Sequence, residues 1–155
     1  MLCSKIILEA LPNIHLLGML TMSYTLVFRA KALVPIYGYV LLNGLLAGFD
    51  VWWLPYLYIW TVLWGVTMLL PRDMSPRVKR IVYPLVCCLH GLAFGLLYAP
   101  AQALLFGFTK EQTIAWIVAG LPFDVTHGVS NLLVGFLILP FSELLGKLVK
   151  KGYFR

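Results

Sequence analysis

Long apolar runs, separated by short polar connections, make up most of this chain. A helix that crosses a bilayer needs about 20 apolar residues, and five of these runs reach or approach that length. They lie at 14–28, 33–49, 52–70, 81–99 and 114–139. A shorter run at 1–11 precedes them and is interrupted by Pro12 and Asn13. The pattern predicts an all-α integral membrane helical bundle, one domain over 1–155, with five full crossings and a partial first helix.

Prolines and glycines subdivide these runs. Pro100 is expected to end or kink the fourth full crossing, and Pro122 to kink or restart the helix of the fifth, because proline removes a backbone donor and clashes with the preceding turn. Two glycine pairs have the GxxxG spacing that lets helix backbones approach closely: Gly44 with Gly48, and Gly91 with Gly95.

The composition agrees with a membrane protein. The chain is 61% hydrophobic and 12% charged, whereas soluble domains are about half apolar and a quarter charged. The net charge of +6 is spread over separate connections, so no basic stripe for nucleic acid is formed. Cys3, Cys87 and Cys88 lack the spacing of zinc or redox sites, and we interpret them as packing residues.

The basic residues predict an orientation. Ten of the twelve Lys and Arg residues lie in three segments, at 29–31, 71–80 and 141–155, and the alternate connections contain only Lys110. Positively charged connections stay on the cytoplasmic side of a membrane. We therefore expect these three segments and the C-terminus to be cytoplasmic in a multi-pass protein of the cell membrane, with the connections near 12–13, 52–53 and 102–113 outside.

The last long run carries three polar residues within its apolar stretch. Asp124, His127 and Asn131 are spaced i, i+3 and i+7, so that a helix directs all three to one face. Ionisable groups at membrane depth usually face a bundle interior or a wet cavity. One interpretation is a polar seam between helices, in which Asp124 and His127 satisfy each other. The other is a ligand or transport site.

Polar and aromatic residues at the expected outer connections extend this second interpretation. Small-molecule pockets combine aromatic walls with a few convergent polar groups. Asp124 and His127 would supply hydrogen bonds, other amides would orient the ligand, and aromatic rings would stack on it. The predicted substrate-binding residues are Asn13, His15, Trp53, Tyr56, Gln102, Asp124, His127 and Asn131.

Other aromatic and imidazole groups have simpler interpretations. Trp52, Trp60 and Trp64 are expected to belong to the aromatic belt found at membrane interfaces. His90 either pairs with His127 or Asp124, or hydrogen-bonds a neighbouring helix.

The sequence gives little support for catalysis. It contains no HExxH motif or Cys/His cluster for a metal. It also has no Walker-type motif for ATP hydrolysis. Ser130 and His127 lie on one helix without an oxyanion-stabilising device. We therefore expect neither an enzyme nor a resident cofactor.

Several segments together resemble a known family. They are LPNIHL at 11–16, ALVPIY at 32–37, WWLPYLYIW at 52–60, HGLAFG at 90–95 and GLPFDVTHGVSN at 120–131. In this order they resemble a branch of the substrate-binding S components of energy-coupling factor (ECF) transporters. The resemblance covers nearly the whole chain, and its most specific parts are the PFDxxHGxxN-like and WWxPYLYxW-like segments.

This resemblance implies six helices, cytoplasmic termini and a vitamin-sized pocket near the outer face. It also implies docking onto a shared ECF transmembrane subunit driven by two ATPase subunits, with the loaded S component toppling in the membrane. S components dock through small residues on the first helix, where this chain offers Cys3, Ser4 and Ala10. We expect either that the chain starts further upstream or that docking uses another surface, such as the face of Gly91 and Gly95.

The resulting expectation is a membrane-embedded subunit that captures a small nutrient for ATP-driven uptake. The main alternative is a non-transporting scaffold that recruits cytoplasmic or cell-wall machinery through 71–80 and the basic tail. A further alternative is an intramembrane enzyme that uses Asp124 and His127 as acid and base.

Overall fold

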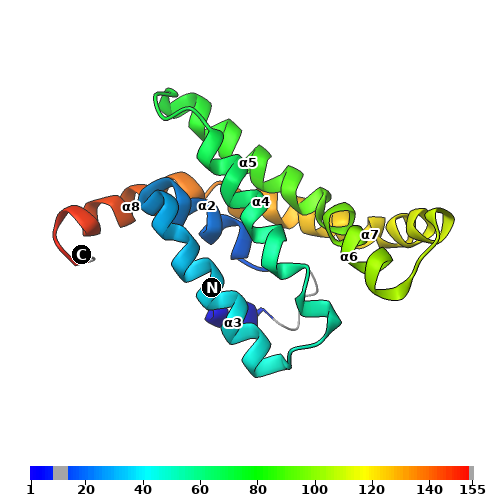
Figure 1. Cartoon of the computed structure of the whole chain (residues 1–155). Helices are drawn as coiled ribbons and strands as arrows, with labels where there is room; N and C mark the ends of the chain where they lie inside the picture. Colours follow the sequence, from blue (N-terminus) through cyan, green and yellow to red (C-terminus); the bar gives the residue numbers. More distant parts are fainter. Residues whose placement is uncertain (9–13, 154–155) are drawn as a thin grey trace.

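The computed structural model describes residues 1–8 and 14–153, and this part of the chain is helical without any strand (Figure 1). The all-α prediction is therefore confirmed. The elements are α1 (Leu2–Ile7), α2 (Leu17–Phe28), η1 (Arg29–Ala32), α3 (Leu33–Ala47), η2 (Val51–Trp53), α4 (Tyr56–Leu69), α5 (Pro76–Leu92), α6 (Phe94–Phe106), α7 (Lys110–Gly135) and α8 (Ile138–Lys150).

Within the described residues, three helical stretches are long and apolar enough to cross a membrane: Leu17–Ala47, Pro76–Phe106 and Lys110–Gly135. The first comprises α2, η1 and α3, and the second comprises α5 and α6. α4, with 14 residues, is shorter than a typical crossing. The structure thus agrees with a membrane protein, and the finer prediction of five full crossings stays a prediction.

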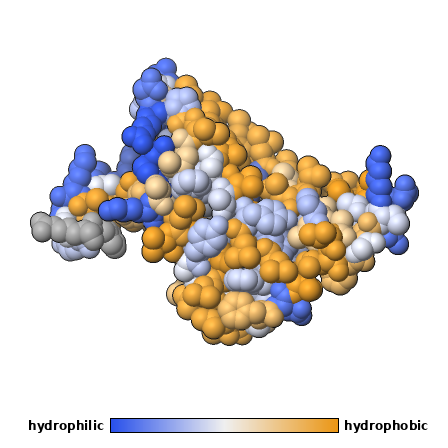
Figure 2. Space-filling model, in the orientation of Figure 1, coloured by the Kyte–Doolittle hydropathy of each residue, from blue (hydrophilic) through white to orange (hydrophobic). Residues whose placement is uncertain are grey.

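The exterior is largely apolar between two polar ends. Figure 2 shows hydrophobic residues over the middle of the visible face and hydrophilic residues towards its left and right ends. Large side chains such as Leu45, Leu89 and Leu133 are more than half exposed. A water-soluble monomer rarely exposes so much contiguous apolar surface, so a bilayer is the solvent that this exterior suits.

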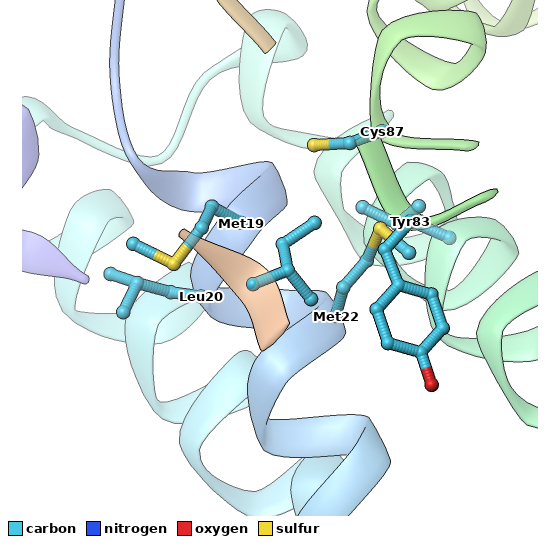
Figure 3. Packing of buried hydrophobic residues seen from close by; sticks show 7 residues of the cluster. Met19, Leu20, Met22, Tyr83 and Cys87 are labelled. Carbon is cyan, nitrogen blue, oxygen red and sulfur yellow. The ribbon is translucent and has the colours of Figure 1, made fainter. Parts of the chain in front are cut away.

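The core is built around α2. Figure 3 shows Met19, Leu20 and Met22 of this helix packed with Tyr83 and Cys87 of α5. Cys87 is fully buried, which fits its interpretation as a packing residue, but Cys3 is exposed, so the same interpretation is wrong for Cys3. Because α2 also contacts α4, α7 and α8, it fixes the positions of the helices that carry the candidate site.

α5 and α7 approach each other through glycines. A Cβ on Gly91 would lie 2.9 Å from the Gly128 Cα, and one on Gly135 would lie 2.7 Å from the Pro84 Cα. Only residues without a side chain allow backbones to pack this closely. The face of Gly91 and Gly95 is therefore covered by α7 and is not open to a partner subunit.

The other glycine pair forms a turn. Gly48 ends α3 with a φ of 89°, a left-handed conformation that glycine adopts readily. Phe49 then folds back over Gly44, where a Cβ would collide with its ring and lie 2.8 Å from Trp53 Nε1. Asp50 follows and accepts a 2.6 Å hydrogen bond from the Val51 N–H. Gly44 thus makes room for the ring of Phe49 and not for the backbone of another helix.

Neither proline ends its helix. α6 continues past Pro100 to Phe106, and α7 continues past Pro122 to Gly135. The break lies instead at Ala93, which caps α5 through a 2.9 Å bond from its N–H to Leu89 O. The expected end at Pro100 and restart at Pro122 are therefore wrong, because a proline inside a helix removes one backbone hydrogen bond without having to end the helix. The alternative of a kink at either proline stays a prediction.

Candidate functional site

Three histidines, the full complement of the chain, meet in the bundle interior. His15 precedes α2, His90 lies near the end of α5, and His127 lies in the middle of α7. The ring centroids of His15 and His127 are 4.8 Å apart, and His90 lies 5.7 Å from the ring of Trp60. We use the term ring cluster for His15, Tyr39, Tyr56, Trp60, His90, Phe94 and His127.

Trp60 of α4 lies at the centre of the ring cluster. Its ring contacts His15 at 6.1 Å, Tyr39 at 6.3 Å and Phe94 at 6.0 Å between centroids. The side chain is only 1% exposed. The prediction that Trp60 belongs to an interfacial belt is therefore wrong. The i, i+4 spacing of Tyr56 and Trp60 placed both on the inner face of α4, and this signal could have identified Trp60.

The ring cluster contains several polar atoms that are buried without a hydrogen-bond partner among the described residues. They are His15 Nδ1, Tyr39 Oη, Trp60 Nε1, His90 Nδ1 and His127 Nε2. Most buried polar atoms in proteins are paired, and each unpaired one costs about 1–3 kcal/mol. Five such atoms on rings in mutual contact offer a ligand both hydrogen-bonding groups and stacking surfaces.

His90 is anchored on its other side. Its Nε2 lies 3.2 Å from Ile59 O of α4. The expectation that His90 hydrogen-bonds a neighbouring helix is thus confirmed, and this contact leaves only Nδ1 unpaired.

His15 lies ahead of the apolar helical stretch Leu17–Ala47 and is uncharged at neutral pH. Burial, aided by the nearby charge of Lys5, lowers the pKa of His15 to about 4. An uncharged imidazole can donate from one nitrogen and accept at the other. The ring cluster therefore suits a ligand with donor and acceptor atoms better than an anion at this position.

Asp124 has a partner within the protein. Its Oδ1 accepts a 2.9 Å hydrogen bond from the Gly95 N–H, one of the free amides at the start of α6. α6 has no side-chain cap of its own, and a carboxylate is stabilising at a helix N-terminus. Asp124 thus caps α6 from α7 and joins the two helices. The Asp124–His127 pair that the polar-seam interpretation included is not among the hydrogen bonds of the described residues.

Asn131 joins α5 and α7. Its Nδ2 donates to Cys87 O at 3.2 Å, and the residue is fully buried. Its Oδ1 has no partner among the described residues. Gly18 of α2 approaches the same amide, since a Cβ there would lie 3.3 Å from Nδ2. The predicted inward face of Asp124, His127 and Asn131 is confirmed, but its members meet different neighbours.

The remaining predicted site residues are dispersed. Trp53 is half-buried and donates from Nε1 to Val40 O at 2.8 Å, whereas Tyr56 belongs to the ring cluster. Gln102 is half-buried on α6, and in the described chain no hydrogen bond connects it to the ring cluster. Asn13 lies outside the described residues. Of the predicted set, His15, Tyr56 and His127 are thus brought together.

The three histidines are not arranged as metal ligands. Among the described residues there is no group of three or more His, Cys, Asp or Glu side chains placed to hold a metal ion. The His15 and His127 rings pack edge to face, at 78°. The ring cluster instead offers ring faces and edges for stacking and unpaired polar atoms for hydrogen bonds.

Comparison with protein-family models, curated proteins and solved structures gave no match for this chain. The resemblance to ECF S components therefore rests on the sequence segments alone.

Proposed function

We propose that this chain is the membrane-embedded substrate-binding subunit of an ECF-type importer, which captures a small vitamin-like nutrient at the outer face. The observation that supports this function best is the ring cluster with its five unpaired buried polar atoms. A ligand that pairs with these atoms relieves a cost that the free protein bears. The aromatic faces add stacking surface, as is usual in small-molecule sites.

The polar residues of α7 have two roles in this proposal. His127 contacts the ligand, together with His15 and Trp60, because its Nε2 is buried and unpaired. Asp124 and Asn131 hold α7 against α6 and α5 through their bonds to Gly95 and Cys87. They position the ligand-binding helix, and their loss acts on binding through its placement.

Transport in this proposal depends on partners. The chain has no ATP-binding motif of the Walker type, so the energy comes from an ECF transmembrane subunit with two ATPase subunits. The proposal includes five full crossings with the three basic segments and the C-terminus in the cytoplasm. In this orientation the aromatic segment around 52–60 is near the outer surface.

Co-purification tests the proposal. A C-terminally tagged chain would be co-expressed with the ECF transmembrane and ATPase subunits of its host, extracted in mild detergent and examined for bound protein and small molecules by mass spectrometry. Stoichiometric retention of the ECF subunits, with a bound small molecule whose retention falls in the Tyr39→Phe variant, is the expected result. A folded chain that retains neither would favour the scaffold function instead.

A further inference from the structure

A second site lies at the end of the bundle where the basic segments meet. A cavity of about 310 Å³ opens there, and its lining includes Arg29, Arg72, Lys79, Tyr83, Leu139 and Glu143. Leu70, at the end of α4, also lines this cavity and lies ten residues after Trp60 of the ring cluster. At 1.5 Å per helical residue, the cavity is therefore roughly 15 Å from the ring cluster. The ring cluster contributes no residue to its lining.

The cavity combines positive charge with an apolar wall. Arg29, Arg72 and Lys79 line it together with one carboxylate, that of Glu143. Leu26, Val27 and Leu139 are among the apolar residues of the wall. Three cations against one anion leave the cavity positively charged, so an anionic group next to a hydrocarbon portion complements it.

Arg29 has an unusual conformation at this cavity. It is the one non-glycine residue with positive φ in the described chain, at φ 55° and ψ −122°. Such a conformation is strained in a residue with a side chain and is often found at functional sites. The side chain donates from Nη2 to Met68 O at 2.9 Å, while its Nε is buried without a partner among the described residues. This unpaired guanidinium N–H can donate to an anion.

The start of α5 adds to the positive potential. Ser75 caps this 17-residue helix by accepting a hydrogen bond from the Val78 N–H, and Pro76 in the first turn lines the cavity. The free amides at a helix N-terminus carry partial positive charge and favour anions such as phosphate.

We propose that this cavity binds a phosphate group, carried either by an anionic lipid headgroup or by a soluble phosphate ester. Arg29, Arg72 and Lys79 contact the phosphate oxygens, and arginine forms paired hydrogen bonds to them. The apolar residues Leu26, Val27 and Leu139 accommodate the carbon portion of the ligand.

The test uses paired variants of the full-length protein. Arg72→Gln/Lys79→Gln removes two cations of the cavity. Arg77→Gln/Arg80→Gln removes two neighbouring cations that are exposed and lie outside the lining. Delipidated protein in detergent would be titrated with phosphatidylglycerol, phosphatidylcholine and glycerol 1-phosphate, and binding would be measured by native mass spectrometry.

The wild type is expected to prefer phosphatidylglycerol over phosphatidylcholine. The cavity pair should weaken phosphatidylglycerol binding by roughly ten- to thirty-fold, since each basic residue near an anionic surface contributes about 1 kcal/mol. The control pair should change it less than three-fold. Glu143→Gln removes the carboxylate of the lining and should strengthen binding.

Glycerol 1-phosphate distinguishes the two phosphate sources. If it binds as tightly as phosphatidylglycerol, the site serves a soluble phosphate ester; if it binds much more weakly, the site serves a lipid. Equal losses in the cavity pair and the control pair would overturn the proposal, because they would indicate diffuse surface charge. Absence of both the lipid preference and glycerol 1-phosphate binding would overturn it as well.

Discussion

Two tyrosines of α3, Tyr37 and Tyr39, have hydroxyl groups in opposite environments. The Tyr39 hydroxyl is buried in the ring cluster without a partner in the described chain. The Tyr37 hydroxyl is exposed and bonds to Leu57 O at 2.8 Å. Removing an unpaired buried hydroxyl relieves a desolvation cost, whereas removing a paired one loses a hydrogen bond worth about 1 kcal/mol. The two residues therefore form a matched pair for mutation.

We expect Tyr39→Phe to keep or slightly raise stability while weakening ligand binding by roughly ten-fold, the value of one hydrogen bond inside a protein. Tyr37→Phe should lower stability by up to about 1 kcal/mol and leave binding unchanged. Thermal unfolding in detergent and ligand titration would be measured on both variants. Unchanged binding in Tyr39→Phe would contradict a ligand at the ring cluster.

His15 predicts a pH dependence of stability. Burial lowers the pKa of His15 to about 4 from 6.5, so the unfolded chain binds a proton at this residue before the folded chain does. Stability is therefore complete above pH 6.5 and is lost as the pH falls towards 4, by about 3 kcal/mol in total. In His15→Phe the loss between pH 7 and pH 5, followed by chemical denaturation, should be smaller than in the wild type. Equal losses would contradict a buried, neutral His15.

At the scale of elements, Asp124 and Gly95 connect α7 to the start of α6. A Cβ on Gly95 would collide with Asp124 Oδ2, whereas a Cβ on Gly120 would meet nothing within 4 Å. We expect Gly95→Ala to destabilise the protein by about 1–3 kcal/mol. Gly120→Ala should be neutral or stabilising by up to about 1 kcal/mol because alanine favours a helix. Denaturant unfolding of both variants measures the difference, and equal stabilities would contradict the close contact.

Asp124→Asn and Asp124→Ala separate the two interpretations of this carboxylate. Asparagine retains an oxygen that can accept from the Gly95 N–H, so a capping role predicts near-normal uptake in Asp124→Asn. The same role predicts a stability loss of about 1 kcal/mol in Asp124→Ala. A substrate contact predicts instead that both variants lose uptake while remaining stable in the membrane. Uptake assays paired with unfolding measurements decide between them.

The helices and the inward face of α7 could be predicted from periodicity, because a helix places Asp124, His127 and Asn131 on one side wherever it lies. The break at Ala93 could not, since Gly91 and Gly95 on either side of it also fit a continuous helix with close packing, and its capping group, Asp124, lies 31 positions later in the chain. The central position of Trp60 could be predicted only in part, from its i, i+4 spacing to Tyr56. Tryptophan suits both an interface and a core, and only packing against His15 and Phe94 decides between them.

At the scale of the molecule, the apolar exterior separates two polar ends (Figures 1 and 2). Arg29, Arg72 and Glu143 come from the three basic segments and line one cavity, so these segments share one end. The α6–α7 connection, with its Thr109 capping box, lies towards the right of Figure 1, away from the α4–α5 connection at the upper left. In the proposed topology these two connections therefore lie on opposite sides of the membrane.

Cysteine labelling tests which of the two connections, α4–α5 or α6–α7, lies on the cytoplasmic side. Single cysteines at Asp73 and at Lys110, both exposed, would be introduced after Cys3, Cys87 and Cys88 have been replaced by alanine. The positive-inside rule predicts that a membrane-impermeant maleimide labels Lys110→Cys in intact cells and Asp73→Cys only after permeabilisation. The reverse pattern would place the cationic cavity outside. The proposed uptake direction would then fail, because it requires the basic segments to lie on the cytoplasmic side, where the ATPase subunits hydrolyse ATP.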